Sequence, residues 1–158
     1  MWNQKLILSK TIILSVVIIL SGCANTVLKG VTPEGNNVYI GPVPINNTLA
    51  YQEFIKSQRT ELDRIQYLLN RVKTAPDIRY ERDGVSFNSD KTYQTGLWLV
   101  GNSYNKNTDA ITFLRNHVWF AKPSMAPHLA HFPDGTTHVA YYIFINELAL
   151  LDESIQNE

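Results

Sequence analysis

The chain has 158 residues, enough for one domain, and its 44% hydrophobic and 18% charged residues are typical of a globular protein rather than a disordered one. Fourteen basic residues balance fourteen acidic ones, so the formal net charge is zero. This charge argues against a general nucleic-acid binder, which normally carries a strong basic excess. The single cysteine excludes an internal disulfide and a zinc site built from several cysteines.

The first 22 residues have the pattern of a secretory signal. Lys5 and Lys10 precede an apolar run over residues 11–20, and Ser21 and Gly22 end that run. A transmembrane helix needs about 20 apolar residues, roughly twice what this run provides. The positive flank, short apolar core and small-residue end therefore predict a signal peptide over residues 1–22 that is removed.

The signal ends in Leu20-Ser21-Gly22-Cys23, which resembles the bacterial lipobox. The resemblance implies cleavage before Cys23, a diacylglycerol on its sulfur and an acyl chain on its new amino group. Stable membrane attachment takes at least two such chains. No other cofactor is expected. The alternative is a buried free cysteine in an ordinary signal or helix.

Ala24 follows the cysteine. In the enterobacterial pattern, Asp at this position retains lipoproteins in the inner membrane. Ala24 therefore implies attachment to the outer membrane on its periplasmic face, with the inner membrane as the alternative. Removing residues 1–22 removes two lysines and no acid, so the mature chain has a formal charge of −2 and no polybasic anchor supplements the lipid.

Residues 23–47 are expected to form the lipidated N-terminus and a linker. Glycines and prolines punctuate the stretch and no helical period survives in it. This favours a tether that lifts a domain off the bilayer. The alternative, which Tyr39 and Ile40 permit, is that the stretch packs along the domain. The compact domain is expected over residues 48–152, and residues 153–158 form a polar tail that frays.

Spacings of four and three residues predict a helical face over residues 48–74. The face consists of Tyr51, Ile55, Gln58, Leu62, Ile65, Leu69 and Val72. Asn47 or Thr48 can cap its start, and Pro76 ends it. Gln58 interrupts the apolar stripe, so the segment is either one helix or two helices with a break at residues 57–60.

A hairpin and a helix are expected next. Asp83-Gly84 is a favoured two-residue turn, and the alternation on either side of it predicts two strands within residues 78–87. Ser89 or Asn88 can cap the helix that follows. Gly96 in the middle of that helix costs about 1 kcal/mol relative to Ala, which predicts a close contact with another helix.

The remaining elements complete an α+β pattern. Thr108 is expected to cap a third helix, residues 129–132 to form a strand, and Pro133-Asp134-Gly135 to form a turn. Thr136 or Thr137 is expected to cap the last helix. The order of elements predicts a small single α+β domain with about four helices and a small antiparallel sheet.

Three segments carry a further pattern: Glu61 with Ile65-Gln66-Tyr67-Leu68-Leu69 and Val72, then Tyr80-Glu81-Arg82-Asp83-Gly84, then Phe113-Leu114, Lys122-Pro123 and Phe132-Pro133-Asp134-Gly135. Over roughly residues 60–152 this pattern resembles an uncharacterised family of small exported bacterial proteins. Asp83 stands where that family usually has Asn, and Ala75-Pro76 where a Ser-Cys pair often sits. The resemblance implies a compact exported domain and supplies no catalytic residues.

Three histidines are the best metal candidates. His128 and His131 are three residues apart, and His138 follows a turn that could bring it near His131. Residues three apart on a strand face opposite sides, which argues against a shared ion. The alternative is that all three are polar strand-edge side chains.

A hydrolase would need a nucleophile, a base and an orienting acid. Ser124, either His128 or His131, and Asp134 occur within one short stretch, but no nucleophile-elbow motif accompanies them. Ser124 is also explained as a turn residue. We therefore expect no catalytic site, and keep this triad as an alternative.

Aromatic residues could provide a contact surface. Trp119 and Phe120 follow the end of a predicted helix, and such side chains anchor protein interfaces. The alternative is that they belong to the core. The sequence thus predicts a lipid-anchored, periplasm-facing binding or structural protein that contacts an envelope protein or the cell wall, and binds no nucleic acid. The alternatives are a small hydrolase and a periplasmic metal-binding protein.

The lipobox yields a direct prediction. Cys23→Ser should abolish metabolic labelling with a radioactive fatty acid and leave the precursor uncleaved, because the sulfur that receives the lipid is missing. Labelling and precursor size on a gel measure both effects. A Cys23→Ser protein that still carried label would contradict lipidation at this residue.

Overall fold

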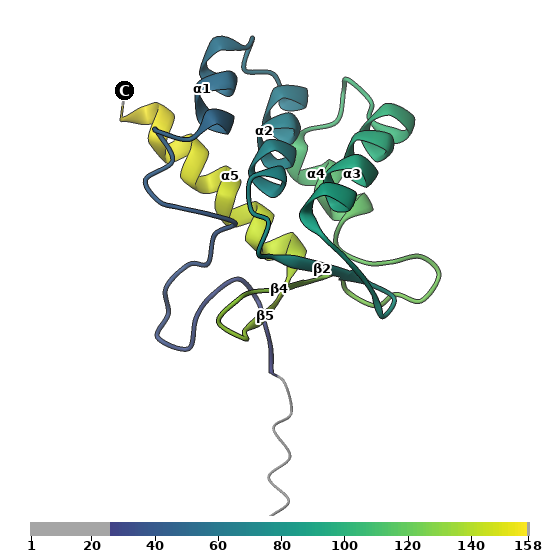
Figure 1. Ribbon diagram of the computed structural model, residues 1–158. Helices are drawn as coiled ribbons and strands as arrows, with labels where there is room; N and C mark the ends of the chain where they lie inside the picture. The colour runs from purple at the N-terminus through teal and green to yellow at the C-terminus, as the bar shows by residue number, and fades with distance from the viewer. Residues whose placement is uncertain (1–25, 158) are drawn as a thin grey trace, which may run out of the picture.

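A mixed five-stranded sheet forms one layer of the fold, and the helices gather on one side of it (Figure 1). The computed structural model describes residues 26–157. The strands are β1 (Val27–Leu28), β2 (Arg79–Arg82), β3 (Val85–Phe87), β4 (Leu129–His131) and β5 (Thr137–Val139), in the spatial order β1-β5-β4-β2-β3. The pairs among β2, β3, β4 and β5 are antiparallel as expected, but β1 pairs parallel with β5.

Residues 26–157 contain five helices, where about four were expected. They are α1 (Leu49–Lys56), α2 (Glu61–Lys73), α3 (Ser89–Ser103), α4 (Ala110–His117) and α5 (Ala140–Gln156). Figure 1 shows α5 running from the sheet towards α1, and Tyr51 of α1 donates a hydrogen bond to the Ser154 carbonyl near the end of α5. Within the part of the chain that the structure describes, no helix has the length and apolar character needed to cross a bilayer.

The segment of residues 48–74 is two helices, with its break where Gln58 interrupts the apolar stripe. Thr48 caps α1, and Thr60 caps α2 in a capping box with Asp63. The break changes the buried face, so Leu62, expected inside, is 40% exposed. Ile65 and Val72 are buried as expected, and Tyr67, Leu68 and Arg71 complete the buried face of α2.

The predicted Asp83-Gly84 turn and the predicted cap at Asn88 are both confirmed. Asp83 and Gly84 both have positive φ, at 52° and 75°, and they join Arg82 to Val85 as a two-residue turn. The Asn88 side chain accepts from the Lys91 amide at 2.8 Å and so caps α3.

Two expected caps are wrong. Asp109, not Thr108, caps α4 by accepting from the Thr112 amide at 2.8 Å. Residues 137–139 form β5, so neither Thr136 nor Thr137 caps the last helix. Strand β5 runs directly into α5, and Val139 at the junction makes no side-chain cap.

Residues 26–47 pack on the domain, which corrects the expectation of a tether. Ile45 is fully buried and Ile40 is 3% exposed, while β1 extends the sheet at the β5 edge. The Asn146 side chain on α5 donates to the carbonyls of Gly30 and Val38. The folded body therefore begins well before residue 48.

A fully buried ion pair joins this N-terminal segment to two helices. Arg71 of α2 contacts both carboxylate oxygens of Glu147 on α5, with Nε–Oε2 at 3.0 Å and Nη2–Oε1 at 3.1 Å. Tyr67 also donates to Glu147, and the Ile40 amide donates to Oε1 at 2.6 Å. The second bond of Arg71 Nη2 goes to the Pro42 carbonyl.

Glu147→Gln should lower the free energy of unfolding by about 3–5 kcal/mol, because it leaves the Arg71 charge buried without its counter-charge. Asp152→Asn is the matched control. It removes a carboxylate that pairs with Arg64 but is 44% exposed, and should cost less than about 1 kcal/mol. Urea denaturation measures both. Equal losses in the two variants would contradict a central role for the buried pair.

Candidate functional site

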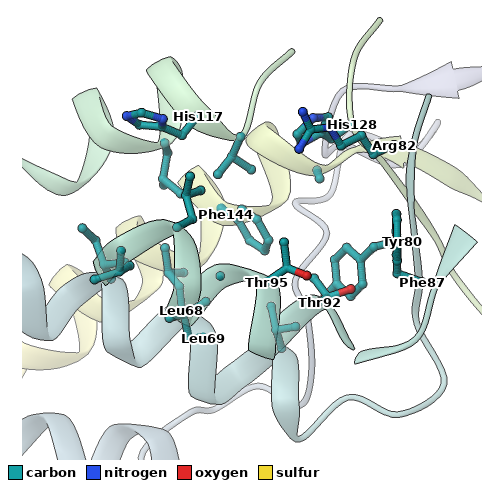
Figure 2. Close-up of a pocket in the computed structure, with 18 of the residues that line it drawn as sticks. Leu68, Leu69, Tyr80, Arg82, Phe87, Thr92, Thr95, His117, His128 and Phe144 are labelled. Carbon is teal, nitrogen blue, oxygen red and sulfur yellow. The ribbon is translucent and has the colours of Figure 1, made fainter. Parts of the chain in front are cut away.

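A largely apolar pocket of about 260 Å³ lies between α3 and the rest of the core (Figure 2). It is partly open to solvent. Its apolar walls come from α2, α3, α4, α5 and the sheet, and include Ile65, Leu68, Leu69, Val72, Tyr80, Phe87, Leu99, Val100, Phe113, Leu114, Leu129 and Phe144. The volume is close to the lower limit of about 300 Å³ for ligand sites, and an apolar wall with few polar groups is typical of them.

Helix α3 is the most solvent-exposed wall of this pocket. Ser89 is its only fully buried residue, and Trp98, which also lines the pocket, is 66% exposed. At Gly96 an added Cβ would lie 2.3 Å from Cδ2 of Leu69 on α2. The close contact expected from Gly96 is thus confirmed. It brings α3 against α2, while Leu99 and Val100 line the pocket and pack against the core.

The polar groups of the pocket include Arg82, His117 and His128 (Figure 2). Nε2 of His128 is buried and makes no hydrogen bond within residues 26–157. Burial, and then the charge of Arg82, lower the pKa of His128, while Asp83 opposes the shift. Burial and the charge of Lys122 likewise lower the pKa of His117. Both imidazoles are therefore neutral at pH 7.

The structure does not bring Ser124, His131 and Asp134 together. Ser124 donates to the Asp83 carboxylate, and Asp134 accepts from the backbone and hydroxyl of Thr136. The other candidate base, His128, lines the pocket. Each member of the expected triad thus contacts a different part of the fold.

His131 instead lies between a hydroxyl and a carboxylate. Its Nδ1 is 3.0 Å from Thr137 Oγ1, and its Nε2 is 3.0 Å from Glu81 Oε2. These group types occur in hydrolase triads. Here they sit on three neighbouring strands, with His131 directly opposite Thr137 in the register. These contacts are explained by a structural role, in which the His131 ring links the side chains of three neighbouring strands.

The three histidines do not converge on one point. His138 is 1% exposed, and its ring packs edge-on against Phe132 at 5.4 Å between centroids. His131 pairs with Glu81, and His128 lines the pocket. Among the residues that the structure describes, no three His, Cys, Asp or Glu side chains are placed to hold a metal ion.

Trp119 and Phe120 belong to a stack of aromatic rings. Trp119 lies 4.9 Å from Phe120 and 4.7 Å from Tyr141 between centroids, and meets Tyr142 edge-on at 6.0 Å. Both Trp119 and Phe120 are half-buried, and Trp119 packs against the core. Trp119 thus packs against the core, as the alternative interpretation of the sequence expected, while Phe120 forms the outer end of the stack. Cys23, the lipidation candidate, lies outside the described residues.

No family model matches the chain, and neither does any curated protein or solved structure.

The stack predicts unequal effects of two truncations. Trp119→Ala should lower the free energy of unfolding by about 3 kcal/mol, because it removes contacts with the core and three rings. Phe120→Ala removes only the outer ring and should cost less than about 1.5 kcal/mol. Thermal unfolding followed by circular dichroism measures both, and equal costs would contradict this assignment. Phe120→Ala is therefore the variant that can test partner contact without unfolding the domain.

Proposed function

We propose that the protein is a lipid-anchored, periplasm-facing binding protein of the bacterial outer membrane. Its domain rests close to the bilayer and binds an apolar ligand in the pocket beneath α3. The observation that carries the proposal is the pocket, whose walls are apolar and whose few polar groups include a buried imidazole nitrogen without a partner in the described chain.

The position of β1 supports a close approach to the membrane. Val27 begins the strand, and only four residue steps separate it from Cys23. An extended chain spans at most about 3.6 Å per residue, so the lipidated residue would lie within about 14 Å of the sheet. An anchor at Cys23 would therefore hold the domain at the bilayer surface.

The contacts of the candidate catalytic residues favour binding over hydrolysis. Ser124 and Asp134 are engaged by different neighbours, and His131 is held between Thr137 and Glu81. A second candidate function is contact with an envelope protein or the cell wall through Phe120. It is favoured by the half-exposed ring at the end of the aromatic stack.

Thr95→Trp tests the pocket, because Thr95 lines it from an exposed position on α3. A bulky ring there should block entry of a ten-carbon alkyl diazirine probe and reduce photolabelling of pocket peptides to background. Gln94→Trp is the matched control, an exposed neighbour on the same helix outside the pocket lining, and should label like the unmodified protein.

Labelling is measured by mass spectrometry on the full lipidated protein in phosphatidylcholine nanodiscs. Unmodified protein without pocket labelling, or equal labelling of Thr95→Trp and Gln94→Trp, would contradict the proposal.

A further inference from the structure

We infer that the pocket ligand is a single-chain amphiphile with an anionic head, whose chain fills the apolar cavity and whose head meets Arg82 and His128. This inference rests on the proposed function and specifies the ligand of the same pocket. It follows from the size of the cavity, the position of Arg82 on β2 and the engagement of the nearby carboxylates.

The size of the cavity favours a slender ligand such as one alkyl chain, because its volume of about 260 Å³ is near the lower limit of about 300 Å³ for ligand sites. The walls are apolar along α2 and α5, where Leu68, Leu69 and Phe144 line the cavity (Figure 2).

Arg82 places a positive charge beside this apolar space. Side chains two apart on a strand share a face, so Arg82 lies on the face of β2 that carries the pocket-lining ring of Tyr80. Its side chain is 50% exposed. Within residues 26–157 its guanidinium makes one ion pair, from Nε to Asp83 Oδ2 at 3.8 Å, and no hydrogen bond. Figure 2 shows Arg82 beside His128, whose Nε2 also has no partner in the described chain.

Two carboxylates near this end are already engaged. Glu81 also lines the pocket, but its Oε2 is 3.0 Å from His131 Nε2. Asp83 accepts a hydrogen bond from Ser124. Arg82 and His128 thus retain unused hydrogen-bonding capacity beside each other, and a guanidinium fork matches the oxygens of a carboxylate or phosphate.

The experiment compares two probes of equal chain length, a ten-carbon diazirine carboxylic acid and the corresponding alcohol. Both are titrated against the full lipidated protein in phosphatidylcholine nanodiscs, with photolabelling of pocket peptides as the readout. Arg82→Gln should weaken apparent binding of the acid at least about tenfold, because it removes a charge-assisted contact, and leave the alcohol within about twofold.

Arg79→Gln is the matched control. Arg79 is an exposed arginine on the same strand that does not line the pocket, so its loss changes net charge equally and should leave both probes unaffected. Competition by unlabelled decanoate and by decyl phosphate distinguishes a carboxylate head from a phosphate head.

Equal weakening of acid and alcohol by Arg82→Gln, or equal weakening of the acid by Arg79→Gln, would overturn the inference. An acid that binds Arg82→Gln unchanged would also overturn it, while alcohol labelling of the pocket would leave the proposed function standing. Failure of both probes to label the pocket of the unmodified protein would overturn the proposed function itself.

Discussion

The buried pair of Arg71 and Glu147 is the constraint on which the rest of the structure depends. Both side chains are almost completely removed from water, at 2% and 0% exposure, so every polar atom near them needs a partner. The partners come from α2, α5 and the segment before α1, where Ile40 and Pro42 supply backbone groups. This requirement, together with buried Ile45 and the pairing of β1 with β5, holds residues 26–47 to the domain, although their glycines and prolines suggest a free linker.

Helix α2 lies between the buried ion-pair network and the apolar pocket. One side of the helix carries Tyr67 and Arg71 into the buried network with α5. Leu69 meets Gly96 of α3 and lines the pocket. Helix α3 exposes much of its surface to solvent, but it packs closely on α2 at Gly96 and places Leu99 and Val100 against the core.

The sequence predicted several features that depend on neighbouring residues, although the caps expected at Thr108 and at Thr136 or Thr137 are wrong. Thr48, Asn88 and the Asp83-Gly84 turn act over a few positions, and each behaves as its residue type indicates. The network around Glu147 could not be found this way, because Arg71 lies 76 residues away and an acid among the apolar residues of α5 has no distinguishing local pattern. The pocket escaped prediction for the same reason, since its walls come from four helices and the sheet.

Two residues of α3 that are unfavourable in a surface helix line that pocket. Gly96 is unfavourable within a helix by about 1 kcal/mol, and Trp98 leaves a large aromatic side chain 66% exposed. Such departures are expected where function constrains a sequence, and here both residues line one cavity. An anchor at Cys23 would hold the domain near a bilayer through β1, which lies at the opposite edge of the sheet from β3 and is separated from β2 by two strands. Tethering would raise the effective concentration of membrane amphiphiles around the pocket, which would favour their binding.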